Sequence, residues 1–167
     1  MLAIIVKLLK ALNSEQSPNQ IAMAVSLATI LGLTPLFSLH NVLVILIALW
    51  FRVNLSILLV SYPFFTFIGF LLSPAFESVG LALLQMPSML EIWETFFNTV
   101  VGRWSNFYYS GVIGSLFVSL LAAAILFPIS KRTIGAYRGI WLVKIEQLKV
   151  SKMLKATKFW QLYSERV

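Results

Sequence analysis

The sequence predicts an all-α integral membrane protein, and its charge content and charge distribution predict this class. Hydrophobic residues make up 59% of the 167 residues and charged residues only 11%, whereas soluble domains average about 25% charged. Arg52 is the one charged residue between Gln16 and Phe76, and residues 104–130 carry none. Since a charge in the middle of a bilayer costs several kcal/mol, such long uncharged segments are typical of membrane-embedded helices.

Three parts follow from the pattern: an interfacial amphipathic helix over 1–16, a membrane domain over 17–130, and a basic helical tail over 131–167. The membrane domain is predicted to hold a short helical hairpin with broken helices, two further transmembrane helices and amphipathic interfacial helices. In residues 1–16, Lys7 and Lys10 lie inside the apolar run, and no small-residue cleavage site follows. This pattern favours a helix lying in the membrane surface over a signal peptide.

The hairpin is predicted from two helix signals and one break. Ser17-Pro18 is a typical helix start, with serine as the N-cap and proline in the first turn. The first helix should run to about Leu33 and break over Gly32–Ser38, because Pro35 disfavours a helical Thr34. The second helix should run from Ser38 or Leu39 to 50–52. Each has about 15 residues against the roughly 20 that a straight span needs, so short spans and a re-entrant hairpin both remain open.

A helix capped by Asn54 is predicted over about 55–72, with an interruption at Ser61-Tyr62-Pro63. Ser73-Pro74 should start another helix, and two amphipathic stretches over 75–86 and 89–101 should lie at the interface. Residues 106–128 form the clearest transmembrane helix. Its small residues should allow close helix packing: Gly111, Gly114, Ser115, Ser119, Ala122 and Ala123.

The tail carries the net charge of the chain. Nine Lys or Arg residues and two Glu residues lie between 131 and 167, which gives +7, and the whole chain is also +7. Such a tail predicts binding to anionic phospholipid of the lipid bilayer on the cytoplasmic side, and not to nucleic acid. The expected anchors are Lys131, Arg132, Arg138, Lys144, Lys149, Lys152, Lys155 and Lys158. With Lys7 and Lys10 at the other end, both termini should be cytoplasmic, which requires an even number of crossings.

Enzymatic motifs are absent from the sequence, which has no Cys, no Asp and one His. We therefore expect no enzyme, no metal and no cofactor. Non-helical backbone at membrane depth must be buried in protein or line a cavity. The two breaks should pack together as a weakly polar notch for a lipid headgroup or a partner's helix. The expected residues are Pro35, Ser38, His40, Asn41, Arg52, Asn54, Ser61, Tyr62 and Pro63. His40 should bond freed backbone groups; a membrane enzyme that uses it is the weakest alternative.

Five short motifs carry a resemblance: Ser17-Pro18-x-x-Ile21-Ala22, Gly32-x-x-Pro35, Leu39-His40-Asn41, Arg52-x-Asn54 and Tyr62-Pro63. Over about residues 17–84 the chain resembles a bacterial membrane family known as a domain of unknown function. Ser61-Tyr62-Pro63 stands where that family usually has an asparagine–proline pair.

The resemblance implies a multi-pass protein of the bacterial inner membrane, encoded beside a larger envelope protein of the lipid-bridging AsmA-like type. The expected function is a non-enzymatic subunit that docks or supports this larger protein in phospholipid transfer towards the outer membrane. The alternative is a stand-alone small transporter or channel with its substrate path at the broken hairpin.

Overall fold

The computed structural model describes residues 17–137, and every regular element in this range is a helix. The elements are α2 (Pro18–Leu33), α3 (Leu39–Trp50), α4 (Leu55–Leu84), the 3-10 turn η1 (Pro87–Met89), α5 (Leu90–Phe97), α6 (Val100–Ser105) and α7 (Ser110–Ala136). The expected helix over 1–16 and the basic residues from Arg138 onward (Lys144, Lys149, Lys152, Lys155 and Lys158 among them) lie outside the described residues.

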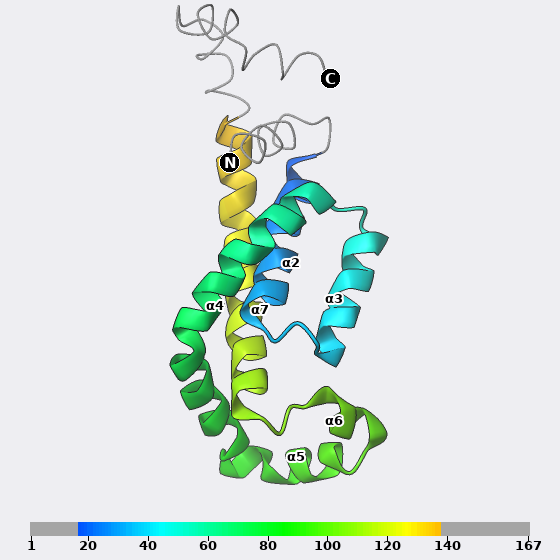
Figure 1. Cartoon of the computed structure of the whole chain (residues 1–167), viewed down its shortest axis with the longest axis vertical. Helices are drawn as coiled ribbons and strands as arrows, with labels where there is room; N and C mark the ends of the chain where they lie inside the picture. Colours follow the sequence, from blue (N-terminus) through cyan, green and yellow to red (C-terminus); the bar gives the residue numbers. More distant parts are fainter. Residues whose placement is uncertain (1–16, 138–167) are drawn as a thin grey trace, which may run out of the picture.

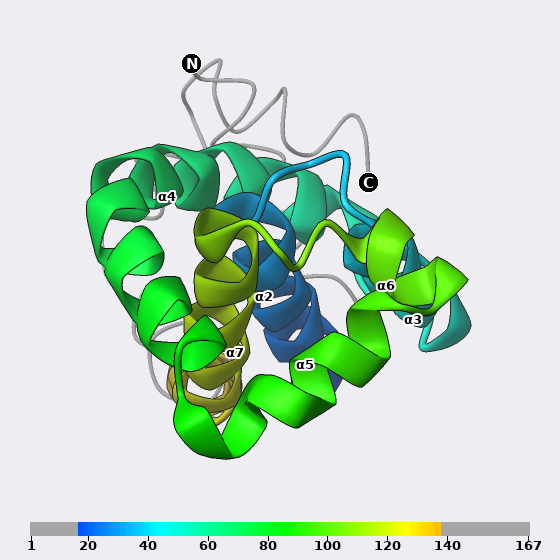
Figure 2. The same cartoon turned by 90° about the horizontal axis from the view of Figure 1, so that it is seen from below.

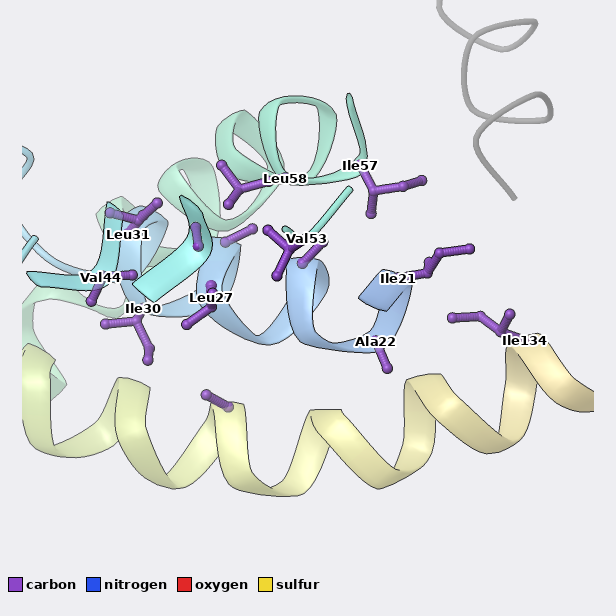
Figure 3. Close-up of a cluster of buried hydrophobic side chains, with 14 residues drawn as sticks. Ile21, Ala22, Leu27, Ile30, Leu31, Val44, Val53, Ile57, Leu58 and Ile134 are labelled. Atoms are coloured by element: carbon purple, nitrogen blue, oxygen red, sulfur yellow. The ribbon is translucent and has the colours of Figure 1, made fainter. Parts of the chain in front are cut away.

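Helix α2 is the centre of the fold. It packs against α4 and α7, while α3 lies beside it and α5 and α6 cross the lower end of the bundle (Figures 1 and 2). Ile21, Ala22, Ala24, Ala28 and Thr29 of α2 are fully buried. Figure 3 shows the α2 side chains lying between residues of α3 and α4 on one side and α7 on the other. Helix α2 is therefore the core of the fold, although it is much shorter than α4 and α7, which pack around it.

Small residues bring the main helices into close contact. A Cβ added at Gly32 would lie 2.9 Å from the Tyr62 carbonyl oxygen of α4, and one added at Gly69 would lie 3.1 Å from Cα of Leu33. A Cβ added at Gly114 of α7 would overlap the carbonyl oxygen of Phe76. On α7 the predicted small-residue face is buried at Gly114, Ser115, Ser119 and Ala123, which confirms that it packs against other helices.

The predicted starts of α2 and α4 are confirmed in detail. The Gln20 amide donates to Oγ of Ser17, and the Ser17 amide donates to Oε1 of Gln20, so Ser17-Pro18 opens α2 with a complete capping box. Oδ1 of Asn54 accepts a hydrogen bond from the Ile57 amide at 3.0 Å. The bounds of α2 and α3 agree with the prediction.

The predicted break at Ser61-Tyr62-Pro63 and the predicted new helix at Ser73-Pro74 are both wrong. One curved helix, α4, runs through Pro63 and Pro74 from Leu55 to Leu84 (Figure 1). Each internal proline removes one backbone hydrogen bond, whereas ending the helix would leave several backbone groups unpaired at each new terminus. Continuing the helix is therefore the less costly solution.

The bounds expected for the last part of the domain also need correction. The stretch predicted over 89–101 divides into α5 and α6 at Thr99, whose hydroxyl caps α6 by accepting from the Gly102 amide at 2.9 Å. Asn106 then adopts a left-handed conformation (φ 59°), so the chain turns there. The last helix consequently begins at Ser110, not at 106, and continues past Pro128 to Ala136.

Two helices are long and apolar enough to cross a membrane. These are α4, with 30 residues, and α7, with 27, and they extend about 45 Å and 40 Å at 1.5 Å per residue. Only 17% and 28% of their most apolar windows are buried, unlike the core helix of a soluble protein. Large side chains such as Phe64, Phe70 and Ile125 stay exposed.

Lys131 and Arg132 lie at one end of the bundle, whereas Glu91, Glu94 and Arg103 lie at the other. The start of α2, the start of α4 and the end of α7 lie together at one end of the bundle (Figure 1). Lys131 and Arg132 are exposed near this end of α7. Helix α5, which carries Glu91 and Glu94, lies at the opposite end.

Candidate functional site

A cavity of about 480 Å³ opens between the C-terminal end of α2, the second half of α4 and the first turns of α7. We call this cavity the notch. Its lining residues are Gly32, Leu33, Thr34, Pro35, Thr66, Gly69, Phe70, Ser73, Phe76, Glu77, Tyr109, Ser110, Gly111, Val112 and Ser115. It therefore combines aromatic and aliphatic walls with hydroxyl groups and one carboxylate.

The α2 side of the notch is the predicted break, and it is held by a small hydrogen-bond network. Thr34 is extended (φ −101°, ψ 157°), as expected before a proline. Nδ2 of Asn41 donates to the carbonyl oxygens of Pro35 and Leu36 at 2.9 and 3.2 Å, and Oγ of Ser38 donates to that of Pro35 at 2.7 Å. The Thr34 hydroxyl lies 3.0 Å from Oδ1 of Asn41. Side chains near the break thus pair its freed carbonyl groups.

The α4 side depends on the helix continuing through Pro74. Thr66, Phe70, Ser73 and Glu77 are spaced four, three and four residues apart, so they lie along one face of a continuous helix. All four line the notch. Sequence reasoning missed this face because it placed Thr66 and Glu77 on separate helices, although their spacing was the available signal.

The start of α7 closes the third side. A Cβ added at Gly80 of α4 would overlap the carbonyl oxygen of Ser110, and the Phe76–Gly114 contact lies one turn farther along. These contacts fix the first turns of α7 against α4. The nearest heavy atom to a Cβ added at Gly111 would be Cγ of Glu77, at 3.8 Å. The Glu77 side chain therefore lies against the first turn of α7.

Glu77 is the one charged residue that lines the notch, and neither Lys nor Arg does. Within residues 17–137 no Lys or Arg forms an ion pair with it. In the same range the hydroxyls of Ser73 and Ser110 make no hydrogen bond. A carboxylate and two hydroxyl groups are thus available to a ligand, beside the apolar rings of Phe70 and Phe76.

His40 does not bond the backbone as expected. Nδ1 and Nε2 are both buried without a hydrogen-bond partner among residues 17–137, and the ring lies 5.8 Å from that of Phe107. Successive helical residues point about 100° apart, so when Asn41 faces the break His40 faces the aromatic side chains before α7. The expectation for Asn41 is confirmed and that for His40 is wrong.

The break at Gly32–Ser38 and the Ser61-Tyr62-Pro63 motif lie next to each other, but they meet mainly through backbone atoms. Gly32 packs against Tyr62 and Phe65 of α4, while Ser61 and Tyr62 are half-buried and Pro63 is exposed. None of Ser61, Tyr62 and Pro63 lines the notch.

Arg52 and Asn54 lie at the other end of α2. There the Gln20 side chain donates to the Arg52 carbonyl oxygen at 3.4 Å, and Asn54 caps α4. Of the nine predicted site residues, Pro35 lines the notch, while Ser38 and Asn41 support it. No group of three or more His, Cys, Asp or Glu side chains that could hold a metal occurs in the part of the chain that the structure describes.

These features define a class: an all-helical protein with two helices able to cross a membrane and a polar notch between them. The chain belongs to the family described as "Uncharacterized protein conserved in bacteria (DUF2062)", whose family model matches residues 3–141. This confirms the resemblance to a bacterial family of unknown function and extends it beyond residues 17–84.

The chain is also similar to an uncharacterized protein of Treponema pallidum (strain Nichols). The two are 24% identical over 150 residues, which cover 90% of this chain and 93% of that relative. No solved structure matches the chain.

Proposed function

We propose that this chain is a multi-pass inner-membrane subunit that supports a larger envelope protein in moving phospholipid towards the outer membrane. In this proposal α4 and α7 cross the bilayer and the subunit catalyses no reaction. The notch receives either a lipid headgroup or a helix of the partner. Support for an AsmA-like partner comes from the family resemblance.

Charge placement supports the orientation that we propose. Lys131 and Arg132 lie at one end of the bundle, and Glu91 and Glu94 lie at the other together with a single cation, Arg103. Positive residues favour the cytoplasmic side of a membrane helix. Two crossings by α4 and α7 then leave both termini in the cytoplasm and the notch towards the outer face.

The notch is the observation that carries this proposal. An apolar bundle gains nothing from an open polar cavity unless something fills it, because unpaired polar groups in an apolar surrounding are costly. Its volume of about 480 Å³ lies within the range of ligand pockets, roughly 300–1,000 Å³. A headgroup with its first acyl carbons, or one side of a partner helix, has this mixed chemistry.

A stand-alone transporter with its path at the broken hairpin has weaker support. A Cβ added at Gly32 would lie 2.5 Å from Cβ of Phe65. At Gly32 the break therefore packs directly on α4, and its open side faces the notch. The family resemblance favours the subunit, and the transporter stays the second candidate with the notch as its path.

The experiment is a pull-down of the tagged full-length chain from its native membrane in mild detergent, followed by mass spectrometry of proteins. A stoichiometric, larger membrane-anchored envelope protein supports the proposal. Recovery of the chain alone, at detergent concentrations that preserve other membrane complexes, would refute the subunit role.

A further inference from the structure

We propose that the notch binds the ammonium headgroup of a phospholipid, and that phosphatidylethanolamine is the membrane lipid that fits it. This inference rests on the proposed function, because it names the lipid class that such a subunit would accept. The evidence is the set of charged and hydrogen-bonding groups that line the cavity.

The charge of the notch selects a cation. Glu77 lines it with no Lys or Arg beside it. A carboxylate near apolar walls favours a positively charged group, and hydrogen bonds from an ammonium to a carboxylate are among the stronger ones in proteins. A lipid with only a phosphate in its headgroup brings a second negative charge and is disfavoured.

The hydroxyl groups complete the match to a zwitterion. Ser73 lies one helical turn from Glu77 along α4, and Ser110 lies on α7. Neither hydroxyl makes a hydrogen bond within residues 17–137, so both can donate to phosphate oxygens. By contrast, the hydroxyls of Thr66 and Ser115 already donate to the carbonyl oxygens of Tyr62 and Val112.

The position of the notch suits a lipid that enters from the side. Tyr109 lines it and Tyr108 is exposed next to it, at the start of α7. Aromatic residues of this kind gather at the level of the headgroups. Phe70 and Phe76 line the cavity on the α4 side, where acyl chains would lie against them.

The notch and the basic tail consequently prefer different lipids. Lys131 and Arg132 lie near the opposite end of α7 from the notch, where anionic headgroups are attracted. Glu77 attracts an ammonium group at the other end. The two lipid contacts can therefore be tested independently.

The test is a lipid titration of the full-length chain in detergent, read by native mass spectrometry. The probes are phosphatidylethanolamine, phosphatidylglycerol and phosphatidylcholine with the same acyl chains. We expect phosphatidylethanolamine to bind about tenfold more tightly than phosphatidylglycerol, as one charge-assisted hydrogen bond allows. Phosphatidylcholine should bind more weakly than phosphatidylethanolamine because its trimethylated ammonium has no N–H to donate.

Three variants localise the effect. Glu77→Gln should abolish the preference for phosphatidylethanolamine. The matched control Glu94→Gln, on α5 and not in the notch, should keep it. Gly111→Leu should weaken all three lipids, because the added side chain enters the notch beside Glu77, whose Cγ is the nearest heavy atom.

Several outcomes overturn the inference. They are equal binding of phosphatidylethanolamine and phosphatidylglycerol by the unchanged protein, retention of the preference in Glu77→Gln, and competition by soluble glycerophosphoethanolamine at the same concentration as the lipid. The last result would show that the acyl chains add nothing to binding, so a soluble headgroup and not a membrane lipid would be the ligand.

The pull-down separates this inference from the proposed function. Glu77→Gln could lose the partner protein and keep its lipid preference. The notch would then hold a cation of the partner, so the lipid inference would fail and the docking role would stand. If no partner is captured while Glu77 still controls the lipid preference, the docking role fails and the lipid site stands.

Discussion

The contact between α4 and α7 gives the sharpest prediction for stability. A Cβ added at Gly114 would overlap the Phe76 carbonyl oxygen and lie 2.8 Å from the Gly80 amide nitrogen. Both atoms belong to the backbone of α4, so no side chain can rotate away. Because carbon–oxygen contacts between neighbouring backbones are normally about 3.3 Å or longer, Gly114→Ala must push the two helices apart.

The loss of stability in Gly114→Ala follows from the separation of α4 and α7. Overpacking a well-packed contact costs about 1–3 kcal/mol, and a gap of about 0.5–1 Å removes a quarter to a half of the dispersion attraction around it. Replacing Gly by Ala in a helix gains up to about 1 kcal/mol of propensity. The matched control is Gly135→Ala on the same helix, because its added Cβ would meet no other element within 4 Å among residues 17–137. The propensity term is common to both variants, so we expect Gly114→Ala to be less stable than Gly135→Ala by about 1–3 kcal/mol.

The assay is reversible unfolding of the full-length chain in mixed micelles with increasing sodium dodecyl sulfate, followed by circular dichroism. Gly114→Ala should unfold at a lower fraction of the denaturing detergent than the unchanged protein, and Gly135→Ala at an equal or higher fraction. Gly114→Leu should be worse than Gly114→Ala. Equal midpoints for Gly114→Ala and Gly135→Ala would refute the close packing of α4 on α7.

Three further predictions concern His40, the tail and the topology. His40→Phe should leave stability unchanged or raise it by about 1–3 kcal/mol, because it removes two buried ring nitrogens that have no partner within residues 17–137 and lie beside Phe107; a marked loss in the same unfolding assay would contradict this. A synthetic peptide of residues 131–167 should bind phosphatidylglycerol vesicles and release as salt rises, since each surface cation contributes roughly 1 kcal/mol that salt screens; salt-independent binding would point to hydrophobic insertion or a protein partner. A phosphatase that is active only outside the cytoplasm should be inactive when fused after Val167, and an active fusion would overturn the proposed orientation.

Local signals predicted α2, α3 and the start of α4. Ser17-Pro18 and Asn54 act within three residues of themselves through capping bonds, so their effect can be read from the sequence. The break at Pro35 can be read from the sequence in the same way, because proline disfavours a helical conformation in the preceding residue, Thr34. The small-residue face of α7 was also predictable, because its residues recur with helical spacing.

The course of α4 and the composition of the notch could not be derived in this way. Proline is a strong local signal for a break, but α4 passes through Pro63 and Pro74, because tertiary packing and backbone pairing outweigh two lost hydrogen bonds. With α4 divided in two, Glu77 appeared to belong to a separate interfacial helix. Its position beside Gly111 depends on the crossing of α4 and α7, which no local signal specifies.

We propose that this chain supports phospholipid movement from the inner to the outer membrane, and this proposal can be tested in cells. The most direct measurement follows newly made, radiolabelled phospholipid into separated outer membranes of the host bacterium, with and without the gene for this chain. We expect slower arrival in the deletion strain, restored by the unchanged gene and not by one encoding Gly114→Leu. Arrival at the same rate in the deletion strain, with the proposed partner protein at its normal level, would contradict the claim.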